Sequence, residues 1–364
     1  MGRILGKKNT KQQSSGVTYA TANGFKNRCY PPEWEKQKTV WMSYPHNEKE
    51  WGKKRLPEIR RFYNKLISII LRFQDVHLIF PSEELFNDVE MLHGTPLRGK
   101  YKLKKIIIPN NDIWIRDHGP FFINSKSEKI VLDFEFNAWG EKFPPWNFDN
   151  EVPKEIAKYL GLKRESYPIV LEGGAIDFSG NGLALTTKQC LLNKKRNPLL
   201  RQKDHENILK TAFNLKEIIW LENGLNDDHT DGHIDNVARF IGHQKILVTT
   251  TKNKKNKNYE ALSYNLDLLK KWRHPSLGYK LEIAEVLLPQ GVRLGKKILP
   301  ASYINFIFLN NAILVPLFNC NEDKEALKIF SKIFPTRKII GIDSSLLIQE
   351  GGGLHCMTKQ EPLI

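Results

Sequence analysis

The chain has 364 residues, of which 40% are hydrophobic, and its formal charge at pH 7 is +16. This length and composition fit one large or two ordinary globular domains with a substantial core. The most apolar stretch, 303–318, contains three asparagines and is too short to span a bilayer, and no apolar signal block is present near the N-terminus. The four cysteines are scattered without a Cys-x-x-Cys pair, which argues against a zinc site and a disulfide framework. We therefore expect a cytoplasmic protein with reduced thiols.

The positive charge is concentrated in two places. Residues 1–32 contain six basic side chains and no acidic one, and four lysines alternate with asparagine over 252–257. We expect residues 1–24 to be a basic, mobile extension and residues 25–364 to be a single catalytic domain. Basic residues interleaved with aromatic ones, which a base-stacking surface requires, are not evident. A nucleic-acid-binding protein on an inactive fold is kept only as the alternative from another functional class.

Apolar patterns predict strands and helices in a recurring order. Strands are expected at 39–44 and 76–80, with an amphipathic helix between them over 55–73. Further helices are expected at 152–160, 202–213, 259–272 and 323–334. Further strands are expected at 105–108, 130–134, 169–171, 218–221, 233–241, 246–250, 304–315 and 339–348, and a turn at 179–182 joins two strands that end at Thr187.

Helices that lie between pairs of strands give about five similar modules of roughly 60 to 75 residues. This alternation favours the α/β class. A doubly wound sheet is the default for such a pattern, but it would place helices between single strands and follow the first strand with a glycine-rich turn. Because the strands come in pairs here, we expect a closed, modular arrangement instead.

Three consecutive glycines at 351–353 lead into Leu354, His355 and Cys356. Glycines let a backbone approach a ligand closely, so Cys356 is a candidate nucleophile. A glycine-rich turn followed by a buried cysteine would have the same sequence. Other residues must therefore decide between the two interpretations.

A cysteine nucleophile needs a partner that handles protons, and His233 in the stretch 230–236 is the best candidate. If this stretch is a strand, His233 and Asp235 project to the same face because they are two positions apart. The same alternation would turn His355 away from Cys356. A His-x-Asp pattern is common by chance and carries little weight alone.

Two further acids stand at predicted strand ends. Asp117 lies in the stretch 114–120, and Glu172 precedes Gly173 and Gly174. Each could also be a solvated acid in a surface turn. Together with Asp235 they would fit a planar guanidinium cation, whose charge would stabilise a cysteine thiolate. Attack of that thiolate on the central guanidinium carbon would then be feasible.

These residues belong to stretches that recur in one known family. The sequence resembles the agmatine deiminases, which are grouped with Porphyromonas-type peptidylarginine deiminases in the guanidino-group-modifying superfamily of the pentein fold. The matching stretches run in family order over about residues 31–362, and they are 32–35, 44–47, 114–120, 171–174, 191–198, 230–239 and 351–358.

The resemblance implies an α/β propeller of five modules, with pseudo-fivefold symmetry around a central site. It implies that Cys356 forms a covalent amidino-thioether intermediate while His233 acts as general acid and base. Asp117 and Asp235 would hold the guanidinium group. The remaining pocket residues that we assign are Glu172, Trp114, Asp228, Gly352 and Gly353. Asp228 would contact the amine at the far end of the substrate, or it is a surface acid that precedes a strand.

The implied reaction converts agmatine and water to N-carbamoylputrescine and ammonia, without a metal or an organic cofactor. Peptidyl or free arginine is the alternative substrate, and an arginine enzyme would need a positive group, such as Arg239, for the α-carboxylate. Glu350 stands where the family commonly has glycine, Gly353 where many members have Asn, and His118 where a small polar residue is frequent. These departures bear on substrate choice more than on the reaction type. The sequence leaves open whether the protein forms a homo-oligomer.

Overall fold

The computed structural model describes residues 28–92, 101–125 and 128–363. The predicted extension over 1–24 therefore lies outside the described residues. The fold is mixed α/β, and none of the helices in the described ranges is long and apolar enough to cross a membrane.

Five sheets repeat one connection, in which an antiparallel pair of strands is followed, after a helix, by a third strand parallel to the second. The first sheet has the order β19-β2-β3-β4, with bounds Lys359–Pro362, Gln37–Ser43, Asp75–Phe80 and Leu103–Ile107. The second has the order β1-β5-β6-β7, with bounds Arg28–Cys29, Phe121–Ser125, Glu128–Glu135 and Lys163–Val170.

The other three sheets have three strands each. They are β8-β9-β10 (Ile176–Phe178, Leu183–Thr187, Glu217–Leu221), β11-β12-β13 (Ala238–Gly242, Lys245–Thr250, Glu282–Leu287) and β16-β17-β18 (Ile307–Leu309, Ala312–Leu317, Lys338–Asp343). A small hairpin pairs β14 (Arg293–Leu294) with β15 (Lys297–Ile298).

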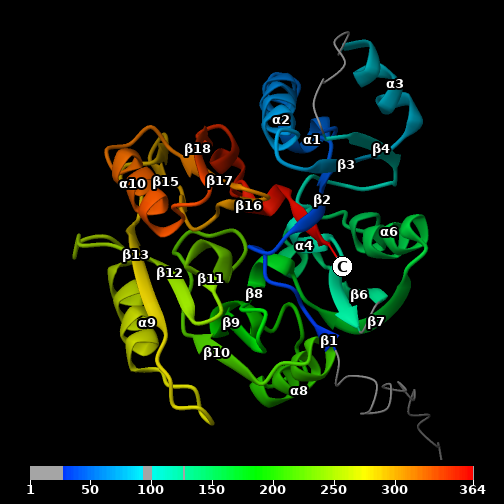
Figure 1. Cartoon of the computed structure of the whole chain (residues 1–364). Helices are drawn as coiled ribbons and strands as arrows, with labels where there is room; N and C mark the ends of the chain where they lie inside the picture. The colour runs from blue at the N-terminus through cyan, green and yellow to red at the C-terminus, as the bar shows by residue number, and fades with distance from the viewer. Residues whose placement is uncertain (1–27, 93–100, 126–127, 364) are drawn as a thin grey trace, which may run out of the picture.

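One long helix belongs to each repeat: α2 (Leu56–Ile70), α6 (Val152–Leu160), α8 (Gln202–Phe213), α9 (Tyr259–Lys271) and α10 (Asp323–Ile333). Figure 1 shows the five sheets placed around a common centre, with these helices toward the outside. Within the described ranges the strands form separate sheets, so no single sheet closes on itself. The remaining helices are α1 (Glu48–Trp51), α3 (Glu83–Leu92), α4 (Ile115–His118), α5 (Ala138–Glu141) and α7 (Lys188–Leu191).

The five predicted helices are confirmed, and α6 and α8 have the predicted bounds. Three predicted strands are wrong in part. The stretch 304–315 is not one strand: it contains β16 and β17, which pair antiparallel across a turn at 310–311. The stretch 233–241 begins with a short 3-10 turn, η4 (Ile234–Asn236), and becomes a strand only at Ala238. The stretch 339–348 leaves β18 after Asp343 and ends in the 3-10 turn η5 (Leu347–Glu350).

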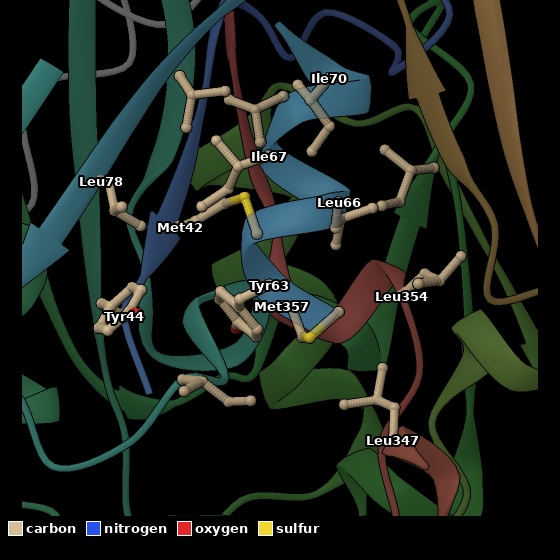
Figure 2. Packing of buried hydrophobic residues seen from close by; sticks show 14 of the residues in the cluster. Met42, Tyr44, Tyr63, Leu66, Ile67, Ile70, Leu78, Leu347, Leu354 and Met357 are labelled. Atoms are coloured by element: carbon tan, nitrogen blue, oxygen red, sulfur yellow. The ribbon is translucent and has the colours of Figure 1, made fainter. Parts of the chain in front are cut away.

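The C-terminal segment connects the fifth repeat to the first. Gly351, with φ of 87°, ends η5, and a 3-10 turn η6 (His355–Met357) then leads into β19, which pairs antiparallel with β2. Leu354 and Met357 are fully buried in the core beneath α2, among Tyr63 and Leu66 (Figure 2). Burying two such side chains contributes about 1.5–3 kcal/mol each, which fixes the turn that carries Cys356.

Candidate active site

A cavity of about 690 Å³, counting its open mouth, lies where the repeats meet. Of the predicted site residues, Cys356, Asp117, Trp114 and Gly352 line it. Five carboxyl side chains belong to its lining: Glu50, Asp112, Asp117, Asp149 and Glu350. Five aromatic side chains also line it: Trp114, Phe136, Trp139, Phe143 and Trp146. The cavity thus combines flat apolar walls with an excess of acidic groups.

Three predicted residues converge on Gly174. A Cβ atom at this glycine would lie 2.6 Å from His233 Nδ1, 2.8 Å from Asp117 Oδ1 and 2.9 Å from Asp235 Oδ2. The Gly174 backbone N–H donates to Asp117 Oδ1 at 2.8 Å. Any side chain at position 174 would therefore displace the predicted acids and base, which explains the second glycine after Glu172.

His233 is fully buried, and its Nδ1 lies 3.7 Å from Asp117 Oδ1. Burial alone would lower the pKa of this imidazole, but Asp117, and less strongly Cys190 and Asp235, outweigh it and hold the pKa well above its ordinary value. The side chain is therefore an imidazolium at neutral pH, as a proton donor must be.

The backbone around His233 differs from the predicted strand. Asp231 and Gly232 have positive φ angles of 63° and 91°. The Asp228 carboxylate accepts three hydrogen bonds from this loop. Oδ1 accepts from the backbone N–H and the hydroxyl of Thr230, at 2.9 and 2.7 Å, and Oδ2 accepts from the His233 backbone N–H at 3.2 Å. A side chain thus replaces a neighbouring strand as hydrogen-bond partner. In the described part of the chain, Asp228 is not one of the residues that line the cavity. Its contact with the far amine of the substrate stays a prediction.

Cys356 is buried, with its Sγ 3.4 Å from Asn305 Nδ2 and 3.9 Å from Asp235 Oδ2. Burial, together with the charges of Asp235 and Asp117, raises the pKa of the thiol well above its ordinary value. In the empty site the sulfur is therefore protonated. A cation placed among these carboxylates would reverse that preference.

Asp235 is also held by His355, whose Nδ1 lies 2.8 Å from Oδ2, the same oxygen that lies 3.9 Å from the Cys356 sulfur. Burial raises the pKa of Asp235, but the hydrogen bond and charge of His355 bring it below its ordinary value. His355 Nδ1 and Cys356 Sγ both approach Asp235 Oδ2, so the opposite-face arrangement expected for a strand does not hold: the two residues lie in a 3-10 turn.

Glu172 lies beneath the cavity rather than among its lining residues in the described chain. Its Oε1 accepts from Arg196 Nε at 2.6 Å, and both side chains are fully buried. Arg196 also donates to Asp231 Oδ2 and to the Thr230 carbonyl, at 2.8 and 2.7 Å. Glu172 therefore orients the loop that carries His233 through Arg196.

The two predicted glycines sit against side chains of the site. A Cβ at Gly352 would lie 2.1 Å from the Trp114 ring, and one at Gly353 would lie 2.2 Å from Asn305 Oδ1. Asn305 in turn accepts from the His355 backbone N–H at 2.9 Å and contacts Cys356. Gly353 therefore permits close packing behind the nucleophile.

Among the residues that sequence reasoning missed, three contact the predicted catalytic residues directly. Trp139 lines the cavity and donates its indole N–H to Asp117 Oδ2 at 2.9 Å, from a turn in which Ala138, Trp139 and Glu141 all have positive φ. Asn305 and Cys190 are the other two. Of the three, only Trp139 had a local signal, the glycine that follows it, because glycine is the residue that most often marks a turn with positive φ.

The model of the family "Porphyromonas-type peptidyl-arginine deiminase" matches residues 29–362, which include every residue of the site described above. The chain belongs to this family. The match runs across all five repeats.

Individual relatives agree. The chain is 35% identical to a Legionella pneumophila protein proposed to be an agmatine deiminase, over 91% of this chain and 94% of that one. It is 32% identical to the agmatine deiminase of Pseudomonas putida, over 94% and 96% of the two chains. A solved structure of a cysteine-to-serine variant of the C. jejuni agmatine deiminase with substrate bound is 34% identical, covers 92% of this chain and 96% of that one, and has a TM-score of 0.83.

Proposed function

We propose that this protein is an agmatine deiminase, which hydrolyses the guanidine group of agmatine to N-carbamoylputrescine and ammonia. The observation that carries the proposal is the convergence of a buried thiol, an imidazolium and two carboxylates, of which Cys356 and Asp117 line one cavity and His233 and Asp235 lie next to them. The agmatine deiminases among its relatives support the same substrate.

Substrate binding would ionise the nucleophile. The guanidinium group lies between Asp117 and Asp235, where its positive charge offsets the two carboxylates that keep the Cys356 thiol neutral in the empty site. The thiol then releases its proton to solvent. Pairing the ionisation with the arrival of substrate keeps a reactive thiolate from persisting without it.

In the first chemical step the Cys356 thiolate attacks the central guanidinium carbon, which gives a neutral tetrahedral intermediate. The His233 imidazolium protonates one amino group, and the carbon–nitrogen bond breaks to release ammonia. The alkyl chain stays attached, so Cys356 carries an alkyl-amidino thioether with one positive charge. His233 is left neutral and can act as a base.

In the second step His233 accepts a proton from a water molecule that attacks the same carbon. The carbon–sulfur bond then breaks, the sulfur takes up the second water proton, and the ureido product leaves. The thiol and the imidazolium are restored. The proton released on substrate binding combines with ammonia, so the net products are N-carbamoylputrescine and ammonium.

The cavity favours agmatine over arginine. Its described lining contains five carboxyl groups and no lysine or arginine, which suits a far ammonium group and offers no fixed positive charge to an α-carboxylate. Arg239, the predicted candidate for that carboxylate, is fully buried and donates to Glu33 and to the Phe306 carbonyl. Arg55 reaches the lining residue Glu350 but is paired with it.

We also propose that the five repeats are the modules of a closed pentein-type α/β propeller and that the enzyme acts on a small cationic metabolite in the cytoplasm. The shared connection of the five sheets around one centre supports the first part (Figure 1). The pairing of the C-terminal β19 with β2 supports it further, because it joins the last repeat to the first.

The test compares agmatine, arginine and an arginyl peptide at equal concentrations, with ammonia and ureido product both measured. We expect kcat/KM for agmatine to exceed the other two by at least about a hundredfold, since one unmatched buried charge costs roughly 2–5 kcal/mol. Cys356→Ala should abolish release from all three, while Cys320→Ala should not. Preference for arginine would overturn the substrate, and turnover by Cys356→Ala would overturn the mechanism.

A further inference from the structure

A second cysteine lies beside the candidate general acid. Ligand atoms of Glu172, Cys190 and His233 all lie within 4.8 Å of one another, and all three side chains are fully buried. They come from three different places in the fold: the end of β7, the helix α7 after β9, and the loop before β11. Sequence separation hides this cluster, which is why the scattered cysteines argued against a metal site.

The cluster has unused bonding capacity. Glu172 Oε1 is bound by Arg196, but Oε2 has no hydrogen-bond partner, and neither ring nitrogen of His233 has one. Buried polar atoms without partners are uncommon, and each costs roughly 1–3 kcal/mol. Here they belong to two residues of one cluster. An ion bound among the three residues would satisfy them.

We propose that Glu172, Cys190 and His233 form an inhibitory site for a thiophilic divalent cation such as Zn²⁺. The Cys190 thiol and the His233 imidazolium would each lose one proton to solvent, and the ion would bind through the sulfur, the freed imidazole nitrogen and one carboxylate oxygen. Sulfur, nitrogen and oxygen donors at about 2.0–2.3 Å are the usual zinc set. Ligand atoms on such a tetrahedron lie about 3.3–3.8 Å apart, so small side-chain rotations from the present spacing would close the site.

The surroundings suit this ion in two ways. Arg196 fixes Glu172 by one oxygen and leaves the other free, as a supporting hydrogen bond to a ligating carboxylate does. Asp117, 3.7 Å from His233 Nδ1, adds negative charge on the other side of the imidazole. Arg196 opposes a cation, but its charge is already shared between Glu172 and Asp231.

The consequence for catalysis rests on the proposed function. An ion on one His233 nitrogen takes the place of a proton there, so the ring cannot become the imidazolium that protonates ammonia, and zinc inhibits without touching Cys356. Binding itself does not depend on the reaction. The two claims can therefore fail separately.

The binding test uses Co²⁺ and Zn²⁺ with the Cys356→Ala variant, which lacks the nucleophile's sulfur. We expect a sulfur-to-cobalt charge-transfer band, and X-ray absorption of the zinc form should show one sulfur among nitrogen and oxygen ligands. Cys190→Ser should lose the band and weaken binding by at least about a hundredfold. A zinc ligand shell of only nitrogen and oxygen atoms in Cys356→Ala would overturn the site, because Cys190 would then not be a ligand. This outcome can be read even if Cys190→Ser fails to fold.

The inhibition test measures ammonia release from agmatine as Zn²⁺ is raised. Half-inhibition should move to at least about thirtyfold higher zinc in Cys190→Ser, since a ligand is lost, while Cys320→Ala should match the wild type. Cys320 is a matched control because it contacts Tyr303 and Asp323, away from the site. Equal sensitivity of Cys190→Ser and the wild type would place the inhibitory ion elsewhere. An inactive but zinc-binding protein would refute the proposed function alone.

Discussion

Two buried charged regions meet behind the cavity, and they differ in how well their groups are paired. Glu33 accepts from Arg116 at 2.8 Å and from Arg239 at 2.6 Å, and its carboxylate lies 2.9 Å from His355 Nε2. In the reactive region, by contrast, both nitrogens of His233 and Asp235 Oδ1 have no hydrogen-bond partner.

The difference separates stability from reactivity. The paired region around Glu33 compensates each buried charge, which is the condition for keeping charges out of water. The reactive region leaves groups uncompensated, and a guanidinium substrate would donate to the Asp235 carboxylate among them. His355 joins the two, because it contacts Glu33 on one side and Asp235 on the other. The stable region thereby fixes the position of a carboxylate in the reactive one.

The largest expected effect is on the paired region. Glu33→Gln keeps the shape but leaves Arg116 and Arg239 without their common carboxylate, which should cost about 3–5 kcal/mol of unfolding free energy. Urea unfolding followed by circular dichroism measures this. Exposed Glu84→Gln on α3 is the control and should change stability by less than about 0.5 kcal/mol.

The contribution of Glu33 to stability should depend on pH in a defined direction. The two arginines and His355 overcome the effect of burial and hold the pKa of Glu33 well below its ordinary value. Its ionisation therefore stabilises the fold above the unfolded pKa, and the contribution is lost as the pH falls through the folded pKa. Glu33→Gln should flatten the acid side of the stability profile. An unchanged profile would show that the pairing contributes nothing.

Asp117→Asn should give the opposite pattern. Burial, assisted by Asp235, raises the pKa of Asp117, so its ionised form costs stability once the pH exceeds the unfolded pKa. We expect unchanged or higher unfolding free energy at neutral pH, with kcat/KM for agmatine about a hundred to a thousandfold lower because the guanidinium loses a carboxylate.

Asp323→Asn is the matched control for Asp117→Asn. Asp323 accepts from Tyr303 and from the Phe318 backbone, outside the cavity lining. It should lose stability and keep activity. A loss of stability in Asp117→Asn as large as in Asp323→Asn would erase the distinction between the two regions.

The reactivity of Cys356 in the empty site is a third test. Because its pKa is raised, alkylation by iodoacetamide should be slow at neutral pH and should rise about a hundredfold between pH 7 and 9, as the thiolate fraction grows. Peptide mass spectrometry resolves Cys356 from the other three cysteines. Fast, pH-independent alkylation would mean that the thiolate is already present without substrate.

The smallest effect is expected at Trp139. Trp139→Phe removes the indole N–H that reaches Asp117 and keeps an aromatic wall, so kcat/KM should fall by about tenfold, the value of one hydrogen bond to a charged group. Trp146→Phe, which also lines the cavity, should change it less. Equal effects would show that ring size, rather than the bond to Asp117, matters.

Part of this structure could be predicted from residue patterns because the causes are local. Helices α6 and α8 end at Gly161 and Asn214, both in the left-handed conformation, and an apolar stripe fixes the face that each buries. Strand β13 was not predicted because its sequence, EIAEVL, is charged and half exposed, without the alternation of a buried strand.

The site divides in the same way. Cys356 and His233 could be found because a glycine run and a short motif mark them. The strand expected at His233 failed because Asp228, five positions earlier, supplies the hydrogen bonds that a neighbouring strand would give. Asn305 and Cys190 could not be found, since Asn305 contacts Cys356 across 51 positions and Cys190 lies beside His233 across 43 positions. Such contacts are set by the arrangement of the repeats.

The covalent intermediate on Cys356 is the central claim. The direct measurement is acid quenching of the enzyme during turnover of saturating agmatine, followed by mass spectrometry of the peptide that contains Cys356. The mechanism predicts an adduct with the mass of agmatine minus ammonia on that residue. An adduct on another residue, or an unmodified Cys356 at every quench time while product accumulates, would contradict it.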